Sequence, residues 1–495
     1  MSQRPNIIFI QNDHQAYYRW GWDGGPKPMR PNFDRLAAEG AAFTKAYCAT
    51  PLCGPTRRTM LTGLYAHTHG QYHNYTDPEY THEVYLQTLK DAGYRSYYFG
   101  KWHAGPGAAK EHGAEGFSYT DYSNPYTKPE YKEYLERYQL PQAVHHIEGY
   151  YDIPEISTRG DWAKCAVGVD YQCEANWCGE HAIGVTTTPK ETHESFFLAT
   201  LACEQLEKLA AEKSGQPFSL RLDFWGPHQP HFPTQEFLDL YKDFEIEPYG
   251  SYASDLQGKP STYFRERSSP FGKDDNLVIP SPVKWEEWQE IVRYCFAHIT
   301  MVDAAGGMVL DKLRELGLDK NTIIVWTTDH GDALASHGGH FDKGSFLSEE
   351  VMRIPFAMKW DGVIPAGQVR DEFICTVDFP VTLLDAAGLS YTKNPVHGRS
   401  LLPLVCGKST GWREDLMCET HGHGYGQDLQ SRLLVYRNWK YVATMGEKHE
   451  LYDLENDPFE LKNLIDDPQY SAVLEDMRAR LKRWQRDTGD HFEVL

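Results

Sequence analysis

The residues with the clearest capacity for chemistry lie between positions 53 and 63, in the string Cys53-Gly54-Pro55-Thr56-Arg57-Arg58-Thr59-Met60-Leu61-Thr62-Gly63. Cys53 offers a nucleophile, and Arg57 places a cation four residues further on. Proline fits the first turn of a helix, and a helix N-terminus favours a developing anion. On its own, a cysteine close to a proline is more often a small buried side chain. A catalytic role for Cys53 therefore requires partners from elsewhere in the chain.

Candidate partners follow four short runs rich in β-branched and aromatic residues, which are typical of buried strands: residues 6–10, 94–99, 218–225 and 322–328. Each run is followed by a segment that bears histidine or aspartate: Asp13-His14, Gly100-Lys101-Trp102-His103, Gly226-Pro227-His228 and Asp329-His330-Gly331-Asp332. Open α/β sheets bind ligands at the carboxyl ends of their strands. The four segments are therefore predicted to meet in one site.

Asp13 and Asp329 carry the hard oxygen ligands that calcium and magnesium prefer, and His330 adds a borderline nitrogen ligand. A single aspartate after a strand is more often a cap or turn residue. Taken together with the string at 53–63, however, the two aspartates indicate a metal site.

The elements between these strands have helical patterns. Ser281 and Pro282 suit the start of a helix, apolar residues recur at three- or four-residue spacing through residue 302, and Gly317 suits its end. A second helix is predicted over residues 194–213. Alternating strands and helices over some 380 residues predict a doubly wound, mostly parallel sheet flanked by helices.

The pattern changes near residue 410. Short strands at 433–436, 439–442 and 450–454, then a charged helical stretch from Ser471, predict a small antiparallel sheet with one helix. We expect a catalytic domain over 1–410 and a small α+β subdomain over 411–495. Residues 105–190 are rich in Tyr, Pro and Gly, show no clear strand order, and are predicted to form an insertion over the strand ends. Within it Tyr131, Tyr134 and Tyr138 have helical spacing and are expected to pack.

Composition excludes some partners. Lys and Arg total 49 against 70 Asp and Glu, a formal net charge of -21, which argues against nucleic acid and anionic membranes. No apolar run approaches the roughly 18 residues of a membrane span. The N-terminus lacks a signal-peptide pattern, which predicts a cytoplasmic protein, although a mature chain after signal removal would look the same.

The string at 53–63 resembles the signature of type I sulfatases, in the alkaline phosphatase superfamily, and the stretch 438–460 is similar to their C-terminal subdomain. The resemblance implies that a maturase, either a formylglycine-generating enzyme or a radical enzyme, oxidises Cys53 to formylglycine. The hydrate of that aldehyde would be the nucleophile toward a sulfate ester. The fold it implies is the mixed sheet described above.

The resemblance also implies a role for each candidate. Asp13, Asp329 and His330 match the metal ligands, together with residue 53, and the ion would be calcium, with manganese or magnesium as alternatives. Arg57 would hold the formylglycine hydrate, and His103, next to Lys101, would take a proton from its second hydroxyl. His228 and Lys343 match the groups that bind sulfate and serve the leaving oxygen.

His14 departs from the family pattern, because many sulfatases carry a second aspartate there. The Asp-His pair resembles members with Asp-Gln, which include choline sulfatases and phosphonate monoester hydrolases. His14 is therefore predicted as a metal ligand, with a place behind the ligands as the alternative. Imidazole would suit manganese better than calcium.

Two rival functions stay open at this point. One is a phosphonate monoester or phosphodiester hydrolase with the same nucleophile. The segment Gly100-Lys101-Trp102-His103 argues against it, because such a segment is typical of sulfatases. The other is a non-catalytic anion or glycan binder in which Cys53 stays unmodified. A sulfated sugar is the preferred substrate by family analogy, against aryl sulfates, choline sulfate and N-sulfated glucosamine. Specificity is expected from 105–190 and from the C-terminal stretch His421-Gly422-His423-Gly424-Tyr425.

Overall fold

The computed structural model describes most of the chain. The described residues are 4–17, 27–120, 124–151, 165–172, 181–265, 272–273, 276–277, 283–343, 346–408, 411–423 and 429–493.

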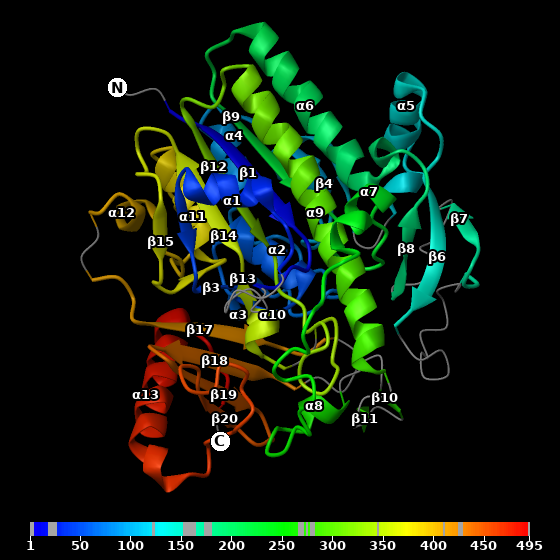
Figure 1. The fold of residues 1–495 in the computed structure, drawn as a ribbon. Coiled ribbons are helices and arrows are strands. Elements are labelled where there is room, and N and C mark those ends of the chain that lie inside the picture. Colours follow the sequence, from blue (N-terminus) through cyan, green and yellow to red (C-terminus); the bar gives the residue numbers. More distant parts are fainter. Residues whose placement is uncertain are drawn as a thin grey trace.

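An eight-stranded mixed sheet forms the centre of the molecule (Figure 1). Its strands, in spatial order, are β15 Gln368–Arg370, β2 Ala41–Phe43, β14 Phe356–Trp360, β12 Thr322–Thr328, β1 Asn6–Asn12, β9 Phe218–Asp223, β4 Arg95–Lys101 and β5 Glu115–Tyr119. β12, β1, β9, β4 and β5 are parallel neighbours, and β14 is antiparallel to both β12 and β2. The four strands predicted from the sequence are therefore adjacent, and their carboxyl ends share one edge of the sheet.

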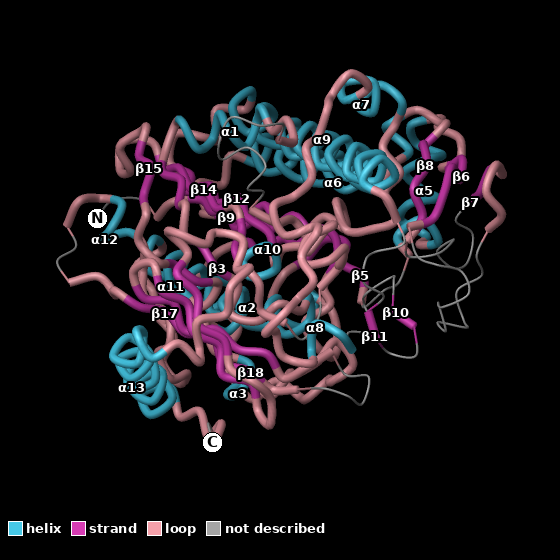
Figure 2. The backbone as a smooth tube through the Cα atoms, turned by 60° about the horizontal axis from the view of Figure 1, so that its bottom comes forward, coloured by secondary structure: helices cyan, strands magenta, loops and turns pink. Residues whose placement is uncertain are grey.

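Helices cover both faces of this sheet. Along β1, Ile8 and Ile10 belong to one hydrophobic core, and Ile7 and Phe9 to the other, because successive side chains in a strand point to opposite faces. The first core is closed by α1 Pro31–Ala38, α6 Glu194–Glu212 and α9 Trp285–Glu315; Figures 1 and 2 show α6 and α9 side by side. The second is closed by α2 Cys53–Thr62, α4 Tyr85–Asp91 and α11 Asp378–Ala386.

The other α-helices and strands before residue 411 are short. They are α3 Ala66–His69, α5 Pro129–Tyr138, α7 Gln235–Leu238, α8 Thr262–Arg265, α10 Glu349–Met352 and α12 Leu402–Val405, a sheet of β3 Ala46–Tyr47, β13 Arg353–Ile354 and β16 Ile374–Cys375, a sheet of β6 Val144–Tyr150, β7 Asp170–Gln172 and β8 Ala182–Thr186, and the pair β10 Gly272–Lys273 and β11 Asn276–Leu277.

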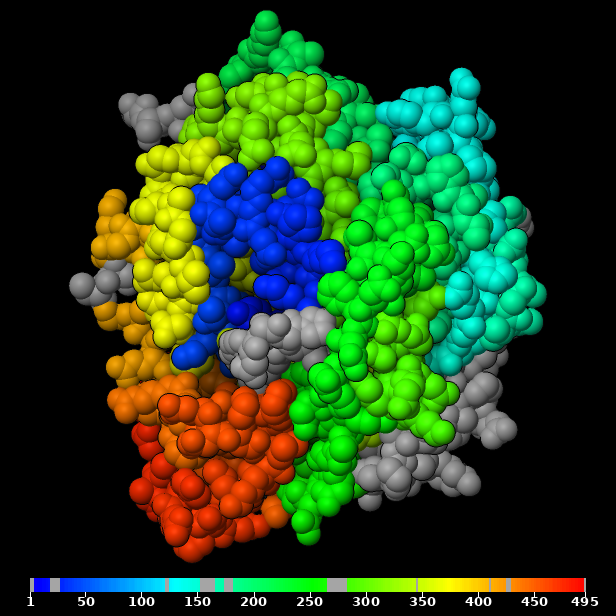
Figure 3. All heavy atoms as spheres, in the orientation of Figure 1, coloured from blue at the N-terminus to red at the C-terminus, as the bar shows by residue number. Residues whose placement is uncertain are grey.

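The C-terminal module, residues 411–493, is a four-stranded antiparallel sheet with one long helix, as predicted. It contains β17 Asp415–Thr420, β18 Ser431–Tyr436, β19 Trp439–Thr444, β20 Glu450–Asp453 and α13 Ser471–Thr488. The sequence analysis missed β17. In Figure 3 the module's red and orange surface lies beside the green segment that precedes α9, which agrees with the bonds from Ser261 to Glu447.

The sequence predictions for the helices and the insertion met mixed outcomes. α6 matches the helix predicted over 194–213, and α9 ends at Glu315, shortly before Gly317. The predicted helix start at Ser281 and Pro282 lies outside the described residues. Residues 115–119, expected within an insertion without strand order, instead form the edge strand β5, paired parallel with β4.

The tyrosine pattern at 131–138 forms α5. Tyr131 and Tyr134 are buried, whereas Tyr138 is largely exposed. Among the described residues, no helix, α5 included, is both long and apolar enough to cross a bilayer.

Candidate active site

The predicted nucleophile is the first residue of a buried helix. Cys53 opens α2, and every residue of that helix is buried. The backbone N–H of Gly54 donates to Asn74 Oδ1 at 3.0 Å. A Cβ at Gly54 would lie 2.7 Å from the side-chain amide of Gln71 and 3.2 Å from the carbonyl oxygen of His103, so glycine allows this close packing without displacing either group. The strand end that carries His103 thus lies directly against the start of α2.

Four predicted metal-binding residues gather around this point. One potential ligand atom each of Asp13, Cys53, Asp329 and His330 lies within 4.8 Å of all the others, and all four residues are buried. Cys53 Sγ is 3.0 Å from His330 Nε2 and 3.6 Å from Asp13 Oδ1. Segments more than 250 residues apart in the sequence supply this group, because β1 and β12 are neighbours in the sheet.

Arg57 lies one helical turn after Cys53 and contacts all three nearby aspartates. Its Nε donates to Asp329 Oδ2 at 3.0 Å, one terminal nitrogen donates to Asp223 Oδ2 at 3.0 Å, and the other lies 3.3 Å from Asp13 Oδ2. It also donates to the carbonyl oxygen of Lys101 at 2.8 Å. Arg57 thus ties the ends of β1, β4, β9 and β12 to α2.

Lys101 and His103 extend from β4 toward the same group. The Lys101 ammonium donates to Asp13 Oδ2 and lies 4.3 Å from the centre of the Trp225 ring. His103 is buried in a left-handed backbone conformation with φ of 44°. Such a conformation is uncommon outside glycine, and here the close packing against Gly54 accompanies it.

His228 and Lys343 lie together in the site, and the His228 ring packs against Trp225. Lys343 Nζ is 3.5 Å from His228 Nε2, and His228 Nδ1 lies 2.8 Å from the carbonyl oxygen of Gln229. The loop that carries His228 is joined to the small sheet of β6, β7 and β8 by backbone bonds between His231 and both Ala182 and Gly184.

His14 is the predicted ligand that lies outside the four-residue group. Its Nε2 is 3.2 Å from Asp342 Oδ1 and 3.7 Å from Asp332 Oδ2, while its backbone N–H donates to Asp329 Oδ1 at 3.0 Å. The geometry favours the alternative stated for this residue, a place behind the ligands.

The structure brings to the site three acidic residues to which the sequence analysis assigned no role, although Asp332 lies in one of the four segments predicted to meet there. Asp223 accepts hydrogen bonds from Arg57, Arg221 and Tyr98, and Asp332 and Asp342 face His14. Asp223 could have been found from the sequence, because it and Arg221 are charged residues inside the predicted strand 218–225, which is otherwise mostly apolar. Asp332 and Asp342 gave no such signal, because aspartates near glycines are common in turns.

Burial and charge set the protonation of these groups. Burial, reinforced by Asp13, raises the pKa of the Cys53 thiol to about 12, so an unmodified Cys53 stays protonated at neutral pH. Burial would raise the pKa of Asp13, but Lys101 and Arg57 hold it well below its usual value. Burial lowers the pKa of His330 to about 4 and, together with neighbouring cations, also lowers the pKa of His103 and of His228.

The donor set fits a divalent cation. Asp13 is held as a carboxylate and His330 as a neutral imidazole, which are the forms that bind metal. Two carboxylates are hard ligands suited to calcium or magnesium. Residue 53 completes the group in the predicted way.

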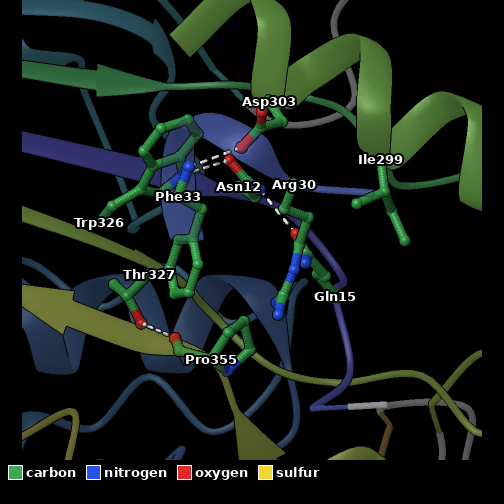
Figure 4. A pocket seen from close by; sticks show the side chains of 9 residues that line it. All are labelled: Asn12, Gln15, Arg30, Phe33, Ile299, Asp303, Trp326, Thr327 and Pro355. Carbon is green, nitrogen blue, oxygen red and sulfur yellow. Dashed lines mark hydrogen bonds between the residues drawn. The ribbon is translucent and has the colours of Figure 1, made fainter. Parts of the chain in front are cut away.

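The β1 end is braced from the side away from Cys53. Figure 4 shows a narrow crevice lined by Asn12, Gln15, Arg30, Phe33, Ile299, Asp303, Trp326, Thr327 and Pro355, which has no room for a water molecule. In it, Trp326 Nε1 donates to Asn12 Oδ1 at 3.0 Å and Asn12 Nδ2 donates to Gln15 Oε1 at 2.6 Å. These bonds fix the residues on both sides of Asp13 and His14, so this crevice serves the site as support.

Comparison with known proteins agrees with this geometry. Residues 5–389 match the Sulfatase family model, and residues 336–487 match the model described as N-sulphoglucosamine sulphohydrolase, C-terminal. The chain is 25% identical over 514 residues to an N-acetylglucosamine-6-O-sulfatase of Bacteroides thetaiotaomicron, with 99% of this chain and 88% of that protein covered.

Solved structures share the fold. A protein in complex with its substrate D-glucosamine-2-N,6-O-disulfate is 20% identical, with a TM-score of 0.73 and 99% of each chain covered. A phosphonate monoester hydrolase of Agrobacterium radiobacter is also 20% identical, with a TM-score of 0.76, 98% of this chain and 96% of that chain. The predicted α/β architecture is thereby confirmed.

Proposed function

The chain belongs to the sulfatase family and is a sulfuric ester hydrolase, and from this premise we propose that it releases sulfate from a sulfated sugar, with residue 53 as its nucleophile after conversion to formylglycine. The position of Cys53 is the observation that carries the proposal. It opens a buried helix, lies 3.0 Å from His330 Nε2, and has Arg57 one turn further on.

Conversion of Cys53 has a physical rationale in this site. Burial and the Asp13 carboxylate disfavour the thiolate, which is the reactive form of cysteine. The hydrate of formylglycine would supply one hydroxyl that attacks sulfur and a second whose deprotonation allows sulfate to leave. The conversion would be the work of a maturase that acts on the 53–63 segment.

A divalent cation in the group of Asp13, residue 53, Asp329 and His330 would supply positive charge for the sulfate oxygens and for the nucleophile. Calcium is the expected ion. The two aspartates leave manganese and magnesium as alternatives.

The other side chains have distinct tasks in this proposal. Arg57 and Lys101 stabilise negative charge on residue 53 and on the sulfate. Neutral His103 accepts the proton of the second hydroxyl, and its lowered pKa keeps it able to do so at neutral pH. Burial holds His228 neutral, so the Lys343 ammonium is the better proton donor to the leaving oxygen, while His228 orients that proton.

The sugar assignment is supported by the C-terminal match and by the relative named for N-acetylglucosamine 6-O-sulfate. O-sulfated and N-sulfated glucosamines are therefore the first compounds to test, ahead of aryl sulfates and choline sulfate. Phosphonate monoesters test the rival function.

The decisive experiment combines the mass of the peptide containing residue 53 with sulfate release from glucosamine 6-O-sulfate and 4-nitrophenyl sulfate. The protein is co-expressed with a maturase, and Cys53→Ala is compared with Cys48→Ala. Cys48 is a buried cysteine five residues earlier, so it controls for loss of a thiol.

We expect a peptide mass of formylglycine, sulfate release, and loss of that activity in Cys53→Ala alone. Unmodified Cys53 without turnover would instead favour the anion-binding alternative. Faster turnover of phenyl phosphonate than of any sulfate ester would favour the phosphonate hydrolase.

A further inference from the structure

The residue that departs from the sulfatase pattern, His14, has a distinctive backbone. Its φ is 64°, in the left-handed region that residues other than glycine rarely adopt. The conformation is held by two bonds, from the His14 N–H to Asp329 Oδ1 and from the Gln15 N–H to the carbonyl oxygen of His330. As a result, neighbouring Asp13 and His14 have different surroundings: Asp13 belongs to the metal-binding group, and the His14 ring faces another acid.

That acid is Asp342. Its Oδ1 lies 3.2 Å from His14 Nε2 and accepts a hydrogen bond from Lys343 Nζ at 3.0 Å. Lys343 Nζ in turn lies 3.5 Å from His228 Nε2, and the His228 ring packs edgewise against the His14 ring with centroids 4.8 Å apart. His14, Asp342, Lys343 and His228 therefore form a closed ring of four contacts, all buried.

The ring lies next to the metal-binding group without joining it. The His14 and His330 rings are 4.9 Å apart, so the two groups adjoin at these two histidines. Asp332, 3.7 Å from His14 Nε2, is a second acid on the same side.

Position matters most for Lys343. A lysine side chain has four rotatable bonds, so a buried lysine that must meet one oxygen needs a fixed partner. Displacement of a reacting group by about 1 Å costs on the order of 100-fold in rate. Asp342 is the carboxylate bonded to Lys343, and His14 limits where that carboxylate can lie.

We propose that His14 and Asp342 act as a positioning pair that aims Lys343 at the leaving oxygen, and that His14 is no ligand of the divalent cation. The inference rests on the proposed sulfatase function. In the step concerned, sulfur gains a bond to the attacking oxygen, whose hydroxyl proton passes to water, and the bond from sulfur to the leaving oxygen breaks with its electron pair on that oxygen. Lys343 gives the leaving oxygen a proton and afterwards takes one back from water, which balances the proton released by the attacking hydroxyl.

The test measures metal content and leaving-group dependence separately. The variants are His14→Asn, Asp342→Asn and the double variant, in matured full-length protein. Asparagine tolerates the left-handed backbone at both positions, where Asp342 has a φ of 63°. Asp311→Asn, on the exposed side of α9, is the matched surface control. Each protein is analysed for bound metal and assayed with 4-nitrophenyl sulfate, a good leaving group, and with a sugar sulfate, a poor one.

The proposal predicts wild-type metal content in all variants. It predicts about a 100-fold or greater loss of kcat with the sugar sulfate and less than about a fivefold loss with 4-nitrophenyl sulfate, because only the poor leaving group needs the proton. It also predicts that the double variant is no slower than the slower single variant, since both residues act through Lys343.

Loss of metal from His14→Asn would overturn the proposal and make His14 a ligand. Equal losses with both substrates, or independent effects of the two substitutions, would also overturn it. If His14→Asn does not fold, Asp342→Asn alone decides by the same two readouts. A wild type inactive on every sulfate ester would instead refute the proposed function, which keeps the two failures distinct.

Discussion

Two buried regions of this protein contain clustered acidic and histidine side chains, and they use them differently. The first is the strand-end site around Asp13, Cys53, Asp329 and His330. The second is the interface between the C-terminal module and the rest of the chain, where two further groups have potential ligand atoms equally close together: His337, Glu350 and Glu460, and His67, Glu419 and Asp490.

At the interface, the carboxylates contact cations and hydroxyls of neighbouring segments. Lys440 of β19 contacts Glu349 at 3.2 Å and Glu460 at 2.7 Å, and Tyr249 donates to Glu350 at 2.7 Å. Arg432 of β18 donates to both oxygens of Asp490. Of these contacts, the one between Lys440 and Glu349 joins the module to the rest of the chain, and the others join segments on the same side of the boundary.

At the strand ends, Asp13 and Asp329 converge on a neutral histidine and on residue 53, and Lys101 and Arg57 hold Asp13 there as a carboxylate. The difference indicates that closeness of donor atoms alone does not identify a metal site. What else those atoms bind decides whether the cluster is chemical or structural. Changes at the strand ends should therefore affect turnover, and changes at the interface should affect stability.

Removal of metal gives the largest expected effect. A chelator should lower turnover by on the order of 1,000-fold or more, because the ion neutralises charge on both nucleophile and sulfate. Elemental analysis of active protein should find a single divalent ion per chain, lost in Asp13→Asn and retained in Glu350→Gln. Additional tightly bound ions that disappear in Glu350→Gln would show that the interface also binds metal and would break the comparison.

Lys101→Met should lower kcat by about 100- to 1,000-fold, the usual loss for one charge-stabilising group in an active site. Its thermal midpoint should stay near that of the wild type, because Asp13 keeps its contact with Arg57. Lys110→Met, at an exposed lysine nearby, is the control and should change neither quantity. A large drop in midpoint with unchanged turnover would place Lys101 in the structural class.

Lys440→Met should show the opposite pattern. Removal of one partner from a buried ion pair typically costs about 3–5 kcal/mol, because the remaining charges stay buried. We expect a clear loss of unfolding free energy in urea with kcat per folded molecule unchanged. Lys448→Met is the matched control: Lys448 pairs with Asp466 on the surface, and such pairs contribute about 0–1 kcal/mol.

The smallest effect concerns the pH dependence of the pair between His67 and Glu419, 2.8 Å apart. Burial lowers the pKa of His67, but the neighbouring Glu419 carboxylate outweighs burial, so the pKa of His67 is raised. Burial raises the pKa of Glu419, but His67 and Arg432 hold it well below its usual value. The stability that protonated His67 contributes to the folded protein is therefore complete below pH 6.5, and it is lost as pH rises through the raised pKa.

His67→Gln should accordingly destabilise the protein by about 1 kcal/mol at pH 6, and the difference from the wild type should shrink toward pH 9. Urea unfolding at several pH values measures it, with exposed His491→Gln as the control. A difference that grows with pH would contradict the assigned direction of the His67 pKa.

Much of the site was predictable because it depends on local patterns. Apolar runs that end in Asp, His or Lys identify strands of a parallel sheet, and strands of such a sheet expose their carboxyl ends on one edge. The predicted strands at 6–10, 94–99, 218–225 and 322–328 are neighbours in the structure for this reason. The module after residue 410 was equally visible, because its strands are joined by short polar turns.

Other features depended on contacts between distant segments. The edge strand β5 has an exposed start and two glycines nearby, so only its pairing with β4 makes it a strand. Asp342 could not be ranked above other aspartates until its partners were known, and nothing in the sequence showed that Asp332 would face His14. The neighbours of His14 could likewise not be predicted from the sequence, because a left-handed backbone held by Asp329 determines where the His14 ring lies.

The sequence by itself thus determined the type of fold, the candidate nucleophile and the inventory of acids, bases and cations, because residue type and periodicity carry that information along the chain. Tertiary structure alone decided which acids meet which cations. Charges at separate strand ends acquire their partners, their protonation and their function only when the sheet brings them within a few ångströms of one another.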